Sequence, residues 1–161
     1  LKFTTQEFNR VMAWTSGSIW GASWKYVLAI LPFILIFMIL TIYKSRYLDV
    51  LNLGDEVSIG LGIDVEKERR KLIIYAVILA GVATSVAGSI GFLGLISPHI
   101  ARRLIGPKHK NLIPVASLIG VFILLVSDTI ARNIIAPMEI PVGIVVSIIG
   151  VPYFIYLMLS K

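Results

Sequence analysis

The chain has 161 residues, of which 57% are apolar and only 15% carry a charged side chain, against about 25% in ordinary soluble domains. This composition excludes an ordinary soluble helical domain, whose helices would show polar residues at helical period, whereas long stretches here carry no charge at all. The formal net charge of +6 would suit a nucleic-acid-binding protein, but these basic residues stand between apolar stretches, where they more often set the orientation of membrane helices.

Residues 1–24 are predicted to form a short helix and a turn outside the membrane. Thr4 and Glu7 have the spacing of a capping box, which starts a helix. Gly17 and Gly21 form one G-x-x-x-G, which we interpret as a turn or close approach rather than a dimerisation site. Indole rings commonly lie at the membrane interface, and this segment has three: Trp14, Trp20 and Trp24. Without an initiating methionine or a signal peptide, we expect the sequence to be the later part of a longer chain.

Five stretches are predicted to cross a membrane. A helix needs about 20 mostly apolar residues to span the hydrocarbon core. The longest uncharged run, 72–101, has room for two crossings. We therefore expect an all-α, polytopic membrane helical bundle with about five transmembrane helices, at 25–43, 71–90, 91–106, 112–131 and 140–159. The third is only about 24 Å long at 1.5 Å per residue, so other helices must enclose it.

Basic residues gather in two of the connections. Segment 44–70 contains Lys44, Arg46, Lys67, Arg69 and Arg70, and Lys71 follows it directly. The connection at 102–111 adds Arg102, Arg103, Lys108 and Lys110 without any acid. Short loops rich in Lys and Arg stay in the cytoplasm, so both connections should be cytoplasmic, and loop 132–139, with Arg132 alone, should face outside. An arginine at mid-bilayer costs about 2.5–3.5 kcal/mol, so Arg102 and Arg103 mark a cytoplasmic exit.

Segment 44–70 is too polar to cross the membrane, yet it has regularly placed apolar residues. These are Leu48, Leu51, Leu53, Val57, Ile59 and Leu61. Gly54 and the glycines at 60–62 are expected to divide the segment into two short helices. From composition alone two interpretations stay open. The segment is either a solvated connector or an exposed amphipathic surface on which a soluble partner docks.

Catalytic and metal chemistry find little support in the sequence. Pro98 bends its helix and frees backbone carbonyls, so we expect His99 to help anchor that segment, with a proton relay as the alternative. No His, Cys or carboxylate lies three or four residues from His99, which disfavours a metal ligand. The chain has no cysteine and no G-x-x-x-x-G-K-[ST] phosphate loop, so any ATP must be hydrolysed by a partner. We expect no cofactor, no metal and no catalytic residue.

The sequence leaves two other functions to consider, a hydrolase and a scaffold. An intramembrane hydrolase would need His99 together with Asp128 or Glu139 and a serine, but the expected topology places His99 near the inner side and the two acids near the outer side. A membrane scaffold that transports nothing would fit the spans and leave the apolar residues of segment 44–70 unexplained.

Four stretches of the chain resemble the C-terminal half of the FecCD-type permease subunit of ABC importers for iron siderophores, haem and vitamin B12. They are WTSGSIWGASW, LNLGDEVSIGLGI, AGSIGFLGLISPHIARRLIGPKHKNLIP and SDTIARNIIAPMEIPVGIVVSIIGVPYFIYLM. The resemblance implies ten transmembrane helices per subunit, and a homodimer or a pair of similar subunits in the bacterial cytoplasmic membrane. It also implies two partners, a cytoplasmic ATPase that hydrolyses the ATP and an extracytoplasmic substrate-binding protein, but no nucleic acid.

The resemblance also assigns roles to residues. It implies that an ATPase-coupling element contains Leu53, Gly54, Asp55, Val57, Ile59, Leu61 and Gly62. It implies that Arg132 meets the binding protein, although Asp128 four residues earlier also predicts a local ion pair. It places the translocation path at Gly91, Gly94, Ser97, Pro98, Gly143 and Ser147. Small residues in membrane helices more often serve packing, and Gly88, Gly91 and Gly94 would share one face if their backbone were helical.

Overall fold

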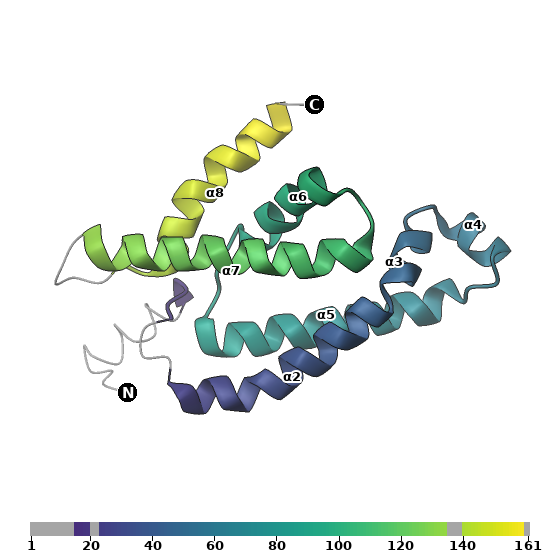
Figure 1. Cartoon of the computed structure of the whole chain (residues 1–161), viewed down its shortest axis with the longest axis horizontal. Coiled ribbons are helices and arrows are strands. Elements are labelled where there is room, and N and C mark those ends of the chain that lie inside the picture. The colour runs from purple at the N-terminus through teal and green to yellow at the C-terminus, as the bar shows by residue number, and fades with distance from the viewer. Residues whose placement is uncertain (1–14, 20–22, 135–139, 160–161) are drawn as a thin grey trace, which may run out of the picture.

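The structure, a computed structural model, describes residues 15–19, 23–134 and 140–159, and every regular element within them is helical (Figure 1). The capping box at Thr4 and Glu7, the tryptophans Trp14 and Trp20, and Gly21 lie outside the described residues. For the part of the chain that is described, the predicted all-α class is confirmed.

Four helices in the described residues are long and apolar enough to cross a membrane. They are α2 (Trp24–Tyr43), α5 (Val65–Ala87), α7 (His109–Ile134) and α8 (Val142–Leu159), with mean hydropathies between 1.6 and 2.6. Many of their large apolar side chains are exposed, which lipid would stabilise and water would not. The polytopic membrane bundle predicted from the sequence is thereby confirmed.

The predicted span at 91–106 corresponds to the short helix α6 (Leu93–Ile105). Its 13 residues make a helix of about 20 Å, less than the hydrocarbon thickness of about 30 Å. It packs against α7 and α8 on one side, while other side chains, such as Leu95 and Leu104, are exposed. That other helices enclose it stays a prediction. Whether it counts as a fifth crossing stays a prediction.

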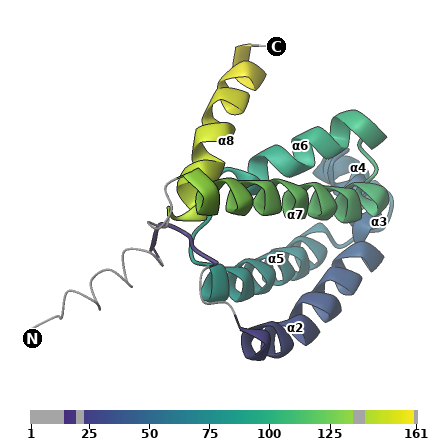
Figure 2. The same cartoon turned by 60° about the vertical axis from the view of Figure 1, so that its left-hand side comes forward.

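The helices pair within the bundle. α2 packs against α5, α6 against α7, and α7 against the start of α8, which then runs away from the other helices (Figures 1 and 2). The buried core between α7 and α8 is small and consists of Ala131, Val142, Val145 and Val146. Glycines allow the closest approaches, since a Cβ on Gly150 would lie 2.6 Å from Cβ of Phe92.

Backbone hydrogen bonds join distant segments at one end of the bundle. The amide of Ser18 donates to the carbonyl of Ala87 at 3.1 Å, and the amide of Gly143 donates to the carbonyl of Gly17 at 3.1 Å. Residues 15–18, the α5–α6 connection and the start of α8 therefore meet there. The helices α3 (Ser45–Leu51) and α4 (Asp55–Gly60) lie at the opposite end (Figure 1).

The connection between α5 and α6 corrects one expectation. Gly88 ends α5 with φ +70°, and Phe92, which precedes α6, has φ +62°. The backbone is thus not helical from 88 to 92, and Gly88, Gly91 and Gly94 do not share one helix face. Phe92 is held in this unfavourable region because its side chain fills the space beside Gly150.

His99 follows Pro98 inside α6, but it does not anchor the segment as the sequence suggested. Its side chain is exposed, and within residues 15–19, 23–134 and 140–159 it makes no hydrogen bond. The neighbouring Ser97 makes the local contact instead, since its hydroxyl donates to the carbonyl of Leu93 at 2.7 Å.

Candidate functional site

The chain between α2 and α5 forms a bend at one end of the bundle, built from α3 and α4. We call residues 48–62 the end bend. Gly54 has φ +104° and precedes α4, and Gly62 has φ +77° and follows it. The amide of Ile63 donates to the carbonyl of Ser58, and the amide of Gly62 donates to the carbonyl of Ile59. These two hydrogen bonds form a Schellman motif, which ends α4. Both positions favour glycine because other residues lose about 1–3 kcal/mol at such positive φ values.

The outer face of the end bend is apolar and exposed. All seven residues expected to form the coupling element are exposed: Leu53, Gly54, Asp55, Val57, Ile59, Leu61 and Gly62. The side chains of Leu53, Ile59 and Leu61 have 63%, 65% and 62% of their surface accessible. They lie outside the candidate spans, and an exposed apolar face of this kind is typical of a surface on which another protein docks.

A cavity of about 460 Å³ lies beside this apolar face. Its lining includes three charged residues that the sequence reading did not assign to the site: Asp64, Glu66 and Arg69. They belong to the run DVEKERRK, whose many charges are typical of the solvent-exposed first turns of a helix. The spacing of that run does not distinguish these three residues from their neighbours, so the sequence contains no signal for them. The face thus combines apolar side chains with a charged border, as interfaces between proteins do.

The inner face of α4 is fixed to its neighbours. Ser58 is buried, and its hydroxyl donates to the carbonyls of Gly54 at 2.8 Å and Val50 at 3.1 Å. Asp55 pairs with Arg69 of α5, with 2.6 Å between Oδ1 and the guanidinium nitrogen. α4 is therefore connected to both α3 and α5.

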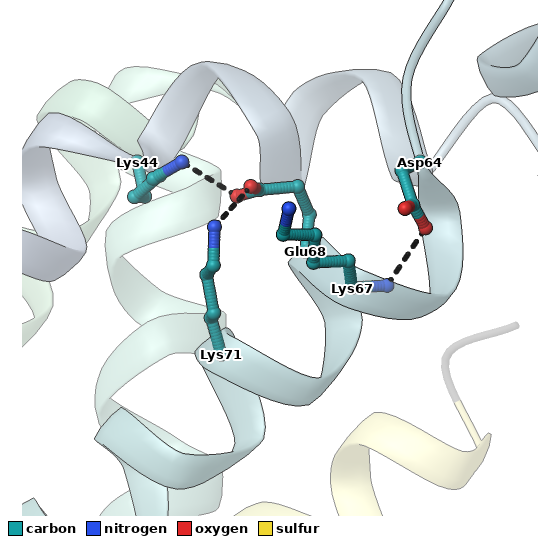
Figure 3. Close-up of polar contacts among 5 residues, drawn as sticks. All are labelled: Lys44, Asp64, Lys67, Glu68 and Lys71. Atoms are coloured by element: carbon teal, nitrogen blue, oxygen red, sulfur yellow. Dashed lines mark hydrogen bonds and ion pairs between the residues drawn. The ribbon is translucent and has the colours of Figure 1, made fainter.

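A buried carboxylate holds the base of the end bend (Figure 3). Glu68, with 10% of its side chain accessible, accepts from Nζ of Lys44 at 2.7 Å and from Nζ of Lys71 at 2.8 Å. The hydrogen bond to Glu68 raises the pKa of Lys44 above 10.5. Asp64 caps α5 by accepting from the amide of Lys67 at 3.0 Å (Figure 3). These contacts join the end of α2 to the start of α5.

A second contact fixes α3 to α7. Oδ1 of Asp49 accepts from the backbone amide of His109 at 3.0 Å and lies 2.6 Å from Nδ1 of the same residue. Burial raises the pKa of Asp49, but the backbone and ring hydrogen bonds from His109 outweigh it, so the net pKa is below 3.8. The end bend is thus on the same side of the bundle as the basic connection that contains Lys108 and Lys110.

Arg132 lies far from the end bend, close to the other end of α7. The 23 residues that separate it from His109 correspond to about 35 Å of helix. Its Nε donates to Oδ2 of Asp128 at 2.8 Å, and 45% of its side chain is accessible. The local ion pair expected from the spacing is present. Part of the loop that follows, 135–139, lies outside the described residues.

The residues expected along the path are only partly brought together. Gly91, Gly143 and Ser147 line an open cavity of about 670 Å³. Its lining also contains Ser89, another small residue that the sequence suggests for the path, and Ser16, for which the sequence gives no signal. A Cβ on Gly143 would collide with the carbonyl oxygen of Ser16, so this glycine also serves packing.

The other three path residues do not line that cavity. Ser97 is buried against α7, where a Cβ on Gly120 would lie 3.2 Å from its Oγ. Gly94 is exposed on α6, and Pro98 is half-buried beside it. Ser97 therefore fits the packing interpretation that the sequence left open.

The described part of the chain holds no cluster of metal-ligating side chains. Within residues 15–19, 23–134 and 140–159, no group of three His, Asp or Glu side chains could hold a metal ion. Asp128 is paired with Arg132 in α7, and His99 belongs to another helix.

Comparison with known proteins agrees with this geometry. The FecCD transport family matches residues 1–160. The iron(3+)-hydroxamate import system permease protein FhuG of Bacillus subtilis is 55% identical over 160 residues, which is 99% of this chain and 48% of that protein. The hemin transport system permease protein HmuU of Yersinia pestis is 41% identical over 156 residues, 97% of this chain and 47% of that protein.

A solved structure is also similar. It is that of a metal-chelate type ABC transporter in an inward-facing conformation, with a TM-score of 0.91 and 28% sequence identity. The match covers 100% of this chain and 52% of the other. The chain thus spans about half the length of the relatives that it matches.

Proposed function

Because the chain belongs to the FecCD transport family, we propose that it forms part of the membrane-spanning permease of an ATP-driven importer for iron chelates. The relatives named above are permease proteins of iron-hydroxamate and hemin systems. A ferric siderophore, haem or a similar chelate is the corresponding substrate class here. One observation carries the proposal, namely the exposed apolar face of the end bend, fixed to three membrane helices.

The end bend faces the cytoplasm in this proposal. The positive-inside rule supports that orientation, since basic residues are concentrated at this end of the bundle. They are Lys44, Arg46, Lys67, Arg69, Arg70, Lys71, Arg102, Arg103, Lys108 and Lys110. As the relatives are bacterial permeases, the membrane is the bacterial cytoplasmic membrane, which the chain crosses several times.

A separate ATPase binds the outer face of the end bend and supplies the energy. Leu53, Ile59 and Leu61 provide the apolar contact, and the cavity beside Arg69 accepts part of the partner. The chain itself binds no cofactor, and ATP is bound and hydrolysed by the partner.

The bend moves as a rigid body during transport. Ser58 attaches α4 to α3 through the carbonyl of Val50, Asp55 attaches it to α5, and Glu68 joins α5 to the end of α2. A displacement of α4 by the ATPase would therefore tilt α2 and α5 rather than deform the bend. Such tilting alternates the access of the path between the two sides of the membrane.

The opposite end receives the substrate. Arg132 contacts an acidic surface of an extracytoplasmic binding protein. A second permease subunit, identical or similar, completes the path beside Gly91, Gly143 and Ser147. Both assignments rest on the family's motifs and on the positions of these residues at the end of the bundle away from the end bend.

Transport of labelled substrate tests the proposal. The full-length permease is reconstituted in vesicles with its partner permease subunit, its ATPase and its binding protein. Uptake of a ⁵⁵Fe-labelled ferric hydroxamate and of labelled haem is then measured with and without ATP. We expect uptake of at least one chelate that depends on ATP. Uptake of none of them, or uptake that does not depend on ATP, would contradict the proposal and favour a membrane scaffold.

A further inference from the structure

A cavity of about 600 Å³ lies where α2, α3 and the start of α7 meet. It is separate from the cavities beside Arg69 and beside Ser147. Its lining combines two cations, two tyrosines and aliphatic side chains from the last turns of α2: Arg46, Lys110, Tyr43, Tyr47, Ile39 and Ile42. The proposed import function assigns nothing to this cavity.

The two cations differ from four others at this end of the bundle, which pair with carboxylates. Lys44 and Lys71 both pair with Glu68, and Arg69 pairs with Asp55. In the described part of the chain, by contrast, no carboxylate lies within ion-pair distance of Arg46 or Lys110. Two like charges that line one cavity without a counter-ion create a positive potential that attracts an anion.

The cavity also lies where a bilayer meets water. α2 is a candidate membrane span that ends at Tyr43, and tyrosines are typical of the interface. Along α2, the exposed side chains of Leu35, Ile36 and Ile39 occupy one face at helical spacing and lead from the cavity toward the middle of the span. The hydrocarbon chains of a lipid anion would contact these apolar side chains, whereas a small soluble anion would leave them exposed.

We propose that this cavity binds the headgroup of an anionic phospholipid. Its phosphate lies between Arg46 and Lys110, and the hydroxyls of Tyr43 and Tyr47 are available as further donors. The acyl chains follow the exposed face of α2. Basic pockets between transmembrane helices at the cytoplasmic side bind such headgroups, and the volume is within the roughly 300–1,000 Å³ of small-ligand sites.

Lipid binding to the full-length protein tests this site. The protein is purified in mild detergent and titrated with phosphatidylglycerol or with phosphatidylcholine of the same acyl chains, and bound lipid is counted by native mass spectrometry. We expect phosphatidylglycerol to bind more tightly. Arg46→Gln or Lys110→Gln should weaken it about fivefold each, and the double variant about thirtyfold, with phosphatidylcholine unchanged.

Matched variants separate charge from position. Lys67→Gln removes an exposed lysine at the same end of the bundle that does not line the cavity, so it should leave the affinity for phosphatidylglycerol unchanged. The charge-retaining variant with Arg46→Lys and Lys110→Arg should bind within about twofold of wild type. If the double glutamine variant does not fold, the affinities of the two single variants for phosphatidylglycerol test the proposal.

Three results would overturn the proposal. The first is equal binding of the two lipids by the wild-type protein, which is also expected if another part of the protein fills the cavity. The second is unchanged affinity in the double glutamine variant. The third is displacement of phosphatidylglycerol by inorganic phosphate or glycerol 3-phosphate at equal concentration, which would indicate a site for soluble anions. None of these results depends on which chelate is transported.

Discussion

Asp49 of α3 and His109 of α7 meet with 2.6 Å between Oδ1 and Nδ1, although 60 residues separate them in the chain. The contact fixes the end bend beside the start of α7, and hence beside Lys108 and Lys110. Together with Glu68 at the base of the bend, it makes the segment an ordered part of the bundle rather than a loose connector.

The contact at Asp49 is expected to hold α3 in place. Asp49→Ala removes the acceptor of both hydrogen bonds, so we expect a loss of about 1–2 kcal/mol and faster amide exchange in residues 45–62. Asp49→Asn keeps an acceptor for the amide of His109 and should lose less. Hydrogen exchange of the detergent-solubilised protein measures both. Equal exchange in wild type and Asp49→Ala would contradict this role.

The pH dependence of the same contact follows from the lowered pKa of Asp49. Because that pKa is below 3.8 in the folded protein, the stability from this carboxylate is fully present above pH 3.8 and is lost as pH falls below that value. We expect melting temperatures of wild type and Asp49→Asn to converge as the pH is lowered through this range. A difference that stays constant below pH 3.8 would show that the charge of Asp49 is not involved.

The ion pairs of Glu68 at the base of the end bend should contribute more to the free energy of unfolding than the exposed pair between Glu66 and Arg70. Glu68→Gln leaves Lys44 and Lys71 without their shared carboxylate in a largely buried place, so we expect a loss of about 2 kcal/mol. Glu66→Gln, which removes an exposed pair with Arg70, should cost less than about 0.5 kcal/mol. Thermal unfolding in detergent compares them, and equal costs would refute the distinction.

The outer face of the end bend is expected to bind the ATPase. Leu53→Glu places a charge on the apolar face without affecting any buried contact, so the ATPase should no longer co-purify with the permease. Leu53→Met keeps the apolar surface and should co-purify as the wild type does. Unchanged co-purification of Leu53→Glu would count against the coupling role of this face.

Two variants of Gly54 separate the effect of backbone conformation on ATPase binding from the effect of surface charge. A Cβ there would meet no atom within 4 Å, so Gly54→Ala has only the backbone strain of φ +104° and ψ 159°, about 1–3 kcal/mol. Gly54→Asp adds a charge to that strain and should abolish assembly with the ATPase, whereas Gly54→Ala should only weaken it. If both variants assemble equally well in the same pull-down, the charge has no effect at this position.

Arg132 is expected to attract the binding protein. Arg132→Glu reverses the charge beside Asp128, so affinity should fall about tenfold at low salt and less at high salt, where such attraction is screened. Arg132→Lys retains the charge and should keep most of the affinity. Equal affinity of wild type and Arg132→Glu at low salt would refute the docking role.

The local features of this fold could be predicted from the sequence. Uncharged runs of about 20 residues indicate membrane helices, and the breaks at Gly54 and Gly62 follow from glycine's access to positive φ. The exposure of Leu53 and Ile59 follows from apolar residues in a segment too polar to cross. These properties depend on neighbours a few residues away, which a sequence pattern contains.

Contacts between distant residues could not be predicted in the same way. Lys44 meets Glu68 across 24 residues and Asp49 meets His109 across 60, and periodicity contains no information at such separations. The positive φ of Phe92 has no signal in the sequence because it results from packing against Gly150. This is why residues 88–92 lack the helical backbone that a shared glycine face would need, and why Ser97 lies in a packing contact rather than beside the cavity lined by Gly143 and Ser147.

The sidedness of the end bend is the most direct test of the transporter assignment. Single cysteines introduced as Ile59→Cys, Lys108→Cys and Arg132→Cys into a cysteine-free full-length protein are labelled with a membrane-impermeant maleimide, in intact spheroplasts and in inverted vesicles. We expect Ile59→Cys and Lys108→Cys to react only in inverted vesicles and Arg132→Cys only in spheroplasts. Reaction of Ile59→Cys from the side opposite to Lys108→Cys would contradict the proposed coupling to a cytoplasmic ATPase.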